Sequence, residues 1–313
     1  MLGKTANGLF WMYRYLERAE NTARLIEAGQ RIALTRLGDS DREWRSVLES
    51  AAVWRSYQTV HEDLSKDTAI DFLLRSRDNT SSVMSCIASA RQNARLVRTA
   101  ITGEVWEATN AAYMNARDIL ARKVSERDLP AALGSIRQNA ALVRGMTHGT
   151  MLRNEIYDFA RMGTFLERAD NTARILDVKY YVLLPSARAV GTSLDNVQWE
   201  TILRSLSARG GFRMEYGSRG GPREITKFLI LDKRMPRSLA FCVSKLQDNL
   251  RYLGAGNSTP APSLQLVGQI ERKYLCHDVD AIFDYGLHDF IQNILDQLAD
   301  LSRQIEVDYR FNE

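Results

Sequence analysis

A segment that occurs twice constrains the fold of this chain more than any other feature of its sequence. Residues 16–27 (LERAENTARLIE) align without a gap on residues 166–177 (LERADNTARILD), and every mismatch is conservative. In both copies the apolar residues recur at three- and four-residue steps, which is the period of an amphipathic helix. The repeat therefore predicts two helices of the same kind, one in each half of the chain.

A second set of matches follows in the same order in both halves. The apolar run 72–74 aligns with 228–230. The same offset continues onto pairs of identical residues, which are Ser82 and Ser238, Cys86 and Cys242, Asn93 and Asn249, and Arg95 and Arg251. The preserved order indicates a tandem duplication rather than one recurring helix motif. We expect two α-helical repeat units, residues 1–147 and 148–313, related by a pseudo-twofold axis and packed as one compact body.

Helices are expected along almost the entire chain. None of the six prolines lies in the first 129 residues, and the alternation of β-branched residues that is typical of strands is scarce. The helical period predicts helices near residues 4–36, 41–58, 66–76, 80–101, 104–122, 130–145, 150–184, 196–206, 224–232, 236–253, 264–275 and 280–310. The expected fold class is all-α, a tandemly duplicated helical bundle with pseudo-twofold related halves.

Composition and charge narrow the class of protein. An apolar content of 45% and a charged content of 26% are those of an ordinary globular protein, and a net charge of +4 gives no argument for a nucleic-acid partner. No run of apolar residues is long enough to span a membrane, and Lys4 and Arg14 leave no room for the apolar part of a signal peptide. The separated cysteines 86, 242 and 276 favour reduced core thiols. We therefore expect a cytoplasmic protein with no membrane partner.

The polar face of each repeated helix carries alternating charges. In the first copy this face consists of Glu17, Glu20, Asn21, Arg24 and Glu27. An amphipathic helix with a solvated face explains that pattern, but it does not explain Arg18 and Arg168, which lie at the edge of the apolar side. A guanidinium group there needs an acceptor, because an unpaired buried charge is costly. A structural ion pair and a ligand-binding arginine both remain open for these two residues.

Packing about a pseudo-twofold axis would bring the two charged helices to a shared cleft. The candidate binding residues of that cleft are Arg14, Glu17, Arg18, Glu20, Asn21, Arg24, Glu167, Arg168, Asp170, Asn171 and Arg174. The four histidines are scattered, and the chain lacks the Glu-x-x-His pair of di-metal bundles. We therefore predict no transition-metal site, while Mg²⁺ between carboxylates remains open.

Two stretches break the helical pattern, a connector at 254–263 and a Gly-rich basic segment at 209–223. The second segment is a candidate anion-binding loop, whose binding residues would be Arg209, Arg213, Tyr216, Arg219 and Arg223. The alternative is a mobile, solvated loop. The chain has no P-loop, dinucleotide fingerprint or nucleophile elbow, so no catalytic residue is identified.

Two motifs of this chain resemble those of the bacterial alpha-E domain family, an all-helical group named for helices that carry a Glu-Arg motif. Residues 11–24 (WMYRYLERAENTAR) resemble its N-terminal signature. Residues 228–232 (FLILD), followed by Pro-Arg-Ser at 236–238, resemble a later motif, with Met235 where a phenylalanine is expected. The resemblance covers essentially the entire chain.

The resemblance implies a functional context rather than a reaction. Members of the family are encoded beside, or fused to, circularly permuted ATP-grasp proteins and transglutaminase-like peptidases. ATP-grasp enzymes join carboxylates to amines through acyl phosphates. We therefore expect an accessory or scaffold protein that helps to make or attach a small peptide, binds a peptide-like or acidic molecule, and meets Mg or ATP only through its partner.

A different class of function also remains open. In this alternative the chain is an enzyme that acts on a peptide or amino acid, with a motif Glu as general base and the arginine segment holding the anionic group. A nucleic-acid binder is not favoured, because the charge is nearly balanced and no reading motif is present.

Overall fold

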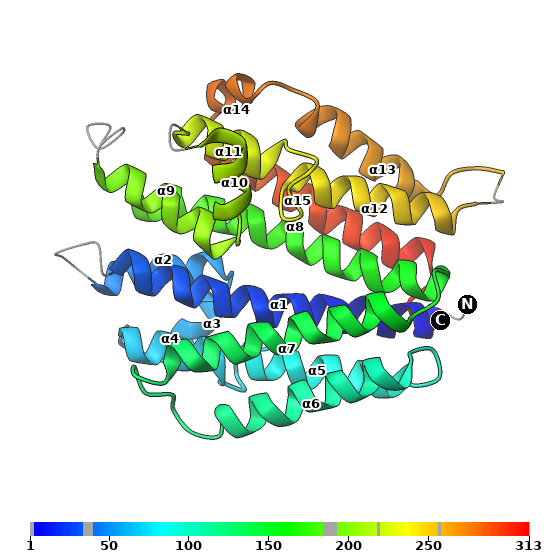
Figure 1. Ribbon diagram of the computed structural model, residues 1–313, viewed down its shortest axis with the longest axis horizontal. Coiled ribbons are helices and arrows are strands. Elements are labelled where there is room, and N and C mark those ends of the chain that lie inside the picture. Colours follow the sequence, from blue (N-terminus) through cyan, green and yellow to red (C-terminus); the bar gives the residue numbers. More distant parts are fainter. Residues whose placement is uncertain (1–2, 34–39, 184–192, 218–219, 256–257, 313) are drawn as a thin grey trace.

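The computed structural model describes residues 3–33, 40–183, 193–217, 220–255 and 258–312, and every regular element in these ranges is helical (Figure 1). In chain order the elements are α1 (Gly3–Ala33), α2 (Ser40–Ser50), α3 (Trp54–Gln58), α4 (Lys66–Leu74), α5 (Val83–Leu96), α6 (Gly103–Ile119), α7 (Leu129–Thr150), α8 (Glu155–Leu183), α9 (Ser193–Ser205), α10 (Arg209–Tyr216), α11 (Pro222–Ile230), α12 (Leu239–Leu253), α13 (Pro262–Ile270), the π-helix η2 (Glu271–Leu275), α14 (Val279–Tyr285) and α15 (Leu287–Asp308). The all-α fold expected from the sequence is confirmed.

Helices α1 and α8, which carry the repeated segment, pack against each other in the middle of the molecule (Figure 1). Helix α1 also contacts α5 and α7, and α6 packs against both α5 and α7. In the same way, α8 contacts α12 and α15, and α13 packs against both α12 and α15. Helix α2 reaches across to α8, and α9 reaches across to α1. The two halves thus make matching contacts, as pseudo-twofold packing requires, while their origin by duplication stays a prediction.

Matching serine caps begin the two helices that flank this centre. Ser82 precedes α5 and Ser238 precedes α12, each in an extended backbone conformation. Each hydroxyl accepts a hydrogen bond from the backbone N–H three residues later, which satisfies one free donor of the first turn. The same local chemistry therefore fixes the chain entry into α5 and into α12.

A glycine sets the closest approach of α1 and α8. A Cβ atom added at Gly163 would lie 2.2 Å from the carbonyl oxygen of Phe10 and 3.3 Å from the amide nitrogen of Arg14. A side chain at this position would collide with the backbone of α1. Gly163 therefore lets the backbones of the two helices approach each other closely.

Two of the predicted helices are divided in the structure. The expected helix at 41–58 breaks at Ala52, whose φ of 57° ends α2 before α3 begins. The expected helix at 280–310 breaks at Gly286, whose φ of 98° suits a glycine and separates α14 from α15. The predicted boundary between the units, at 147 and 148, lies inside α7.

The Gly-rich segment is not the loop that its composition indicated. Arg209–Tyr216 forms helix α10, in which Phe212 is buried and its ring stacks on Tyr216 at 4.9 Å. A Cβ atom at Gly220 would lie 2.3 Å from the ring of Phe212, so this glycine permits close packing rather than motion. Arg219 lies outside the described residues.

The cysteines are only partly as expected. Cys86 and Cys242 are buried free thiols, and burial raises the pKa of each to about 12. Cys276 is exposed, so the prediction of a core thiol is wrong there, because the residue follows the end of η2.

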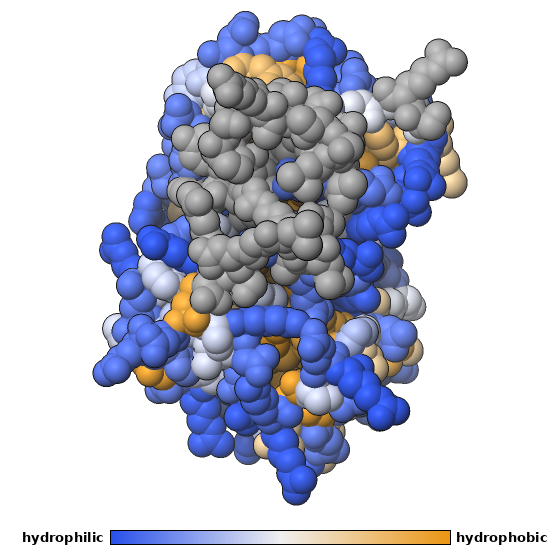
Figure 2. Space-filling model, turned by 90° about the vertical axis from the view of Figure 1, so that its left-hand side faces the viewer, coloured by the Kyte–Doolittle hydropathy of each residue, from blue (hydrophilic) through white to orange (hydrophobic). Residues whose placement is uncertain are grey.

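The face at the left of Figure 1 is mainly hydrophilic, with small scattered apolar areas among the residues that are coloured (Figure 2). Single exposed apolar side chains of this kind are normal on a folded protein. Among the described helices, none is both long enough and apolar enough to cross a membrane.

The close approach at Gly163 predicts opposite effects for two glycine substitutions. Gly163→Ala should lower the free energy of unfolding by about 1–3 kcal/mol, because the new methyl group collides with the backbone of α1. Gly145→Ala in α7 meets no atom within 4 Å and should raise it by about 0.5–1 kcal/mol, since alanine favours helix. Urea denaturation followed by circular dichroism measures both, and equal effects would contradict the close contact.

Candidate functional site

The two Glu-Arg pairs of α1 and α8 cross over and bind each other. Arg18 donates from Nε and Nη2 to the two carboxylate oxygens of Glu167, at 2.5 and 2.9 Å. Arg168 donates from the same two atoms to Glu17, at 2.9 and 3.0 Å. Each guanidinium group thus has the acceptor that its position on the helix requires, and this acceptor lies on the other helix. The arrangement is reciprocal, because each arginine neutralises the carboxylate of the other motif.

Glu17 and its neighbour Glu20 are held in a set of ion pairs that we call the filled cluster. Arg237 donates from Nη1 to Glu17 at 3.1 Å and from Nη2 to Glu20 at 2.7 Å. Arg144 reaches both carboxylates, and Arg24 donates to Glu20 at 2.7 and 3.0 Å. The members of the filled cluster are Glu17, Glu20, Arg24, Arg144, Arg168 and Arg237. Both carboxylate side chains are only 1% exposed, so the acidic groups of this cluster are shielded from solvent.

The corresponding set around Glu167 is less complete, and we call it the open cluster. Arg14 donates from Nε to Glu167 at 2.9 Å, alongside Arg18. Arg174 donates to Asp170 at 2.7 and 3.2 Å, as Arg24 does to Glu20 in the filled cluster. The members of the open cluster are Arg14, Arg18, Glu167, Asp170 and Arg174. Asp170 remains 24% exposed, so this cluster is accessible.

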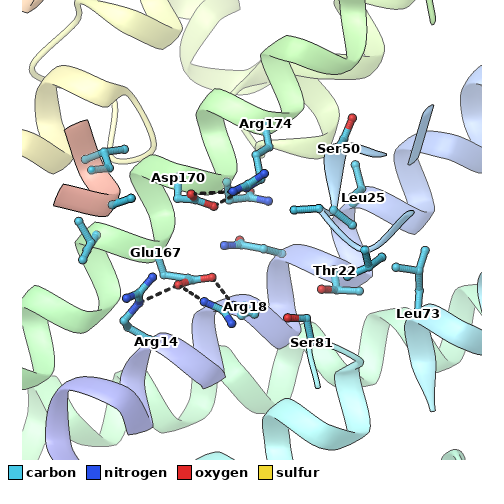
Figure 3. A pocket seen from close by; sticks show the side chains of 18 residues that line it. Arg14, Arg18, Thr22, Leu25, Ser50, Leu73, Ser81, Glu167, Asp170 and Arg174 are labelled. Carbon is cyan, nitrogen blue, oxygen red and sulfur yellow. Dashed lines mark hydrogen bonds and ion pairs between the residues drawn. The ribbon is translucent and has the colours of Figure 1, made fainter. Parts of the chain in front are cut away.

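A cavity of about 290 Å³ lies beside the open cluster. Figure 3 shows Arg14, Arg18 and Glu167 on one side of it and Asp170 and Arg174 on another. The remaining wall comes from the end of α2, the segment that precedes α5, and apolar side chains of α1, α4, α8 and α15. The structure thus brings the candidate residues Glu167, Asp170, Asn171 and Arg174 of α8, but not Arg168, to a hollow that is large enough for a small organic molecule.

Two buried amide side chains on the wall of this cavity have unpaired atoms. Among the described residues, no partner bonds to Nδ2 of Asn21 or to Oδ1 of Asn171, although the residues are only 3% and 7% exposed. An unsatisfied buried polar group costs about 1–3 kcal/mol, so such groups in a folded protein require an explanation. The residues that carry this unpaired donor and this unpaired acceptor both line the same cavity.

Electrostatics keep both motif carboxylates ionised. Burial raises the pKa of Glu17, but the surrounding guanidinium groups, with Arg168 the strongest, outweigh it and hold that pKa below its usual range. Burial likewise raises the pKa of Glu167, but Arg18 and Arg14 together bring it down to about 2. Neither carboxylate takes up a proton near neutral pH. Within the described part of the chain, no group of three His, Cys, Asp or Glu side chains is placed to hold a metal ion.

The described arginines of the 209–223 segment do not gather at one common site in the structure. Arg209 and Arg213 both face Glu200 of α9, the second at 3.8 Å. Arg223 pairs instead with Asp280 of α14, at 2.7 and 2.5 Å. Each of these guanidinium groups already has a carboxylate partner on another helix. The described part of this segment therefore forms separate surface ion pairs rather than one anion site.

The sequence interpretation missed Arg144 and Arg237, which both bind Glu17. Arg144 carries no sequence signal, because it reaches the motif from α7 only after the chain has folded. Arg237 belongs to the Pro-Arg-Ser motif. The offset that aligns Ser238 with Ser82 places Arg237 opposite Ser81, and that difference between the halves was visible in the sequence.

Removing a carboxylate from the crossed pairs should destabilise the fold strongly. Glu167→Gln leaves the guanidinium groups of Arg14 and Arg18 without their counter-charge, so the free energy of unfolding should fall by about 3–5 kcal/mol. The control is Glu49→Gln, which breaks the exposed pair with Arg45 and should cost less than about 1 kcal/mol. Chemical denaturation compares the two, and similar small losses would show that the crossed pairs do not hold the core.

The lowered pKa of Glu167 also predicts a loss of stability in acid. Its pKa is about 2 in the folded protein against an ordinary value of 4.5, so the unfolded chain binds the proton more readily. The stabilisation is complete above about pH 4.5 and is lost as the pH falls toward 2. The urea midpoint should therefore fall across this window, and less steeply for Glu167→Gln. An equal slope in both proteins would contradict the assignment.

Comparison with known proteins identifies the family of the chain. The model of the Alpha-E family, described as a predicted alpha-helical domain with a conserved ER motif, matches residues 1–309. No curated protein and no solved structure matches the chain significantly. The match covers both Glu-Arg pairs that cross between α1 and α8, and it agrees with the resemblance of the N-terminal segment. The chain therefore belongs to the Alpha-E family.

Proposed function

We propose that this protein is a binding subunit that holds a small, peptide-like zwitterion in the cavity of the open cluster, in the service of a circularly permuted ATP-grasp ligase. The observation that carries the proposal is the cavity of about 290 Å³, whose wall contains partly exposed guanidinium groups together with an unpaired buried acceptor. The ligase, rather than this chain, supplies ATP, Mg and the chemical step.

The arginines of the cavity wall are suited to a carboxylate. The bonds of Arg18 to Glu167 and of Arg174 to Asp170 use Nε and Nη2, so Nη1 of each guanidinium stays outside these bonds. In the filled cluster, by contrast, Nη1 of Arg24 donates to the chain at Ser205 and Ser207. The side chains of Arg18 and Arg174 are 26% and 30% exposed. Two such donors match the paired oxygens of a carboxylate.

The wall of the same cavity also carries acceptors for a cationic group. Oδ1 of Asn171 is an unpaired acceptor, and Asp170 is an accessible carboxylate one residue before it. An ammonium or another cationic group has only donors, so it matches these oxygens. Amino acids and short peptides carry a cation and an anion a few bonds apart. A zwitterion therefore fits this wall better than a simple anion.

Binding is better supported than catalysis by this chain. A general base works best with a pKa near the operating pH, whereas the pKa of Glu167 is about 2 and that of Glu17 is lower than usual. Both carboxylates also use their oxygens in bidentate ion pairs. The enzyme alternative, with a motif Glu as base, thus conflicts with the electrostatics of the motif.

The partner follows from the family context. Alpha-E proteins are encoded beside, or fused to, ATP-grasp proteins and transglutaminase-like peptidases, so a helper that presents a peptide to the ligase is consistent with that context. Co-purification of the chain with the neighbouring ATP-grasp protein, followed by mass spectrometry of the bound small molecules, tests this partnership. Recovery of the chain alone and without any small molecule would contradict it.

Titration of the purified protein tests the binding site itself. Alanyl-glutamate should bind without turnover when ATP and Mg²⁺ are present, and Arg174→Ala should weaken that binding by about tenfold or more, because a charged hydrogen bond to the carboxylate is lost. The matched control is Arg204→Ala, which removes an exposed arginine from a similar i,i+4 pair on α9 and should leave affinity unchanged. Turnover by the isolated chain, or equal affinity in both variants, would overturn the proposal.

A further inference from the structure

Ser82 and Ser238 cap corresponding helices in the two halves, but the residue directly before the cap differs. Cys86 and Cys242 each place Sγ 3.9 Å from the carbonyl oxygen of the residue six positions earlier. Together with the matching serine caps of α5 and α12, these contacts show that the backbone runs the same way into both helices. The residue before the cap is Ser81 in the first half and Arg237 in the second.

The side chain of Arg237 occupies the space beside the polar face of α1 and bonds to three residues there. Its guanidinium group donates from Nη1 to Glu17 at 3.1 Å and to Oδ1 of Asn21 at 3.3 Å, and from Nη2 to Glu20 at 2.7 Å. Its side chain is only 8% exposed. One planar cation thus binds three oxygen acceptors of the repeated helix α1.

Ser81 is too short to make the same contacts in the open cluster. The counterparts of the three acceptors are Glu167, Asp170 and Asn171 on α8, and all of them line the cavity together with Ser81. Figure 3 shows Ser81 across the cavity from Glu167 and Asp170. Oδ1 of Asn171, whose counterpart binds Arg237, is buried without a partner among the described residues. The cavity therefore corresponds to the place that an arginine side chain fills in the other half.

The charges of the two clusters allow a further cation in the cavity. Without Arg237, the filled cluster has two carboxylates and three arginines, and the open cluster has the same. The filled cluster contains a fourth guanidinium group, that of Arg237, in addition to these charges. Charge repulsion thus does not prevent the open cluster from taking one as well.

We propose that the cavity of the open cluster binds the guanidinium group of an arginine-like ligand, which occupies the position that Arg237 fills in the other half. This inference rests on the proposed function, because it specifies the cationic end of the zwitterion. A guanidinium group reaches several acceptors with a planar fork of donors, as Arg237 does. An ammonium group is a compact point charge without that fork, and a urea group has no charge to offer the carboxylates.

Calorimetric titration with three amino acids of similar shape tests the chemical class. L-arginine should bind at least about tenfold more tightly than L-citrulline, which replaces the guanidinium with a neutral urea group, and L-lysine should fall between or below them. Agmatine, which lacks the carboxylate, should retain measurable binding. Equal affinities for arginine and citrulline would overturn the inference.

Ser81→Arg gives the open cluster its own guanidinium group. This variant should lose binding of L-arginine and agmatine while its melting temperature stays the same or rises, because the new side chain enters the position that the ligand would occupy. Ser81→Ala is the matched control, and its affinity should equal that of the unchanged protein. Undiminished arginine binding by a folded Ser81→Arg protein would overturn the inference.

A second variant keeps the test decisive if Ser81→Arg does not fold. Asn171→Ala removes the unpaired acceptor and should weaken binding of agmatine by about tenfold, because a hydrogen bond to the cation is lost. Unchanged affinity in that variant would overturn the inference.

The two proposals fail in different ways. Binding of alanyl-glutamate without a preference for arginine over citrulline would leave the proposed function standing and refute the guanidinium site. Agmatine binding that Ser81→Arg abolishes would establish the guanidinium site, even if alanyl-glutamate did not bind.

Discussion

The crossed ion pairs between α1 and α8 determine how the rest of the structure is arranged. Four charged groups lie at the centre of the bundle, and each would cost several kcal/mol if it were buried alone. The arrangement that places Arg18 on Glu167 and Arg168 on Glu17 gives each of them a partner of opposite charge on the other helix. Because the pairs are reciprocal, a shift of one helix along the other would break both at once. The pairs thus fix the register of the two central helices, and the outer helices pack on that frame.

The same frame produces two unequal clusters. Arg237 closes one of them with its side chain, whereas Ser81 leaves the other beside a cavity with an unpaired amide oxygen. A cavity and an unsatisfied acceptor both lower stability, and a protein that needed only a rigid core would gain from filling them. Departures of this kind from good packing are typical of functional sites. The filled cluster thus shows what the open cluster lacks, which is one more cation.

The sequence predicts the all-α fold well, because the helical period is a local property, while the duplication stays a prediction. It also predicts that Arg18 needs an acceptor, but the crossing to Glu167 depends on tertiary packing that no spacing reveals. The segment 209–223 was misinterpreted for a related reason. Its glycines indicated flexibility, whereas Gly220 makes room for the ring of Phe212, and that contact is visible only in the fold.

The proposed complex has a consequence for which end of the bound ligand is available for reaction. In the proposed complex, acidic and amide oxygens hold the cationic end as a charged group, and a protonated amine or guanidinium is a poor nucleophile. That end is therefore protected while it is bound. Under the proposed function, the group that the ligase partner activates or acylates therefore lies at the other end of the ligand. In the proposed complex, the partly exposed guanidinium groups of Arg18 and Arg174 bind the carboxylate of the ligand.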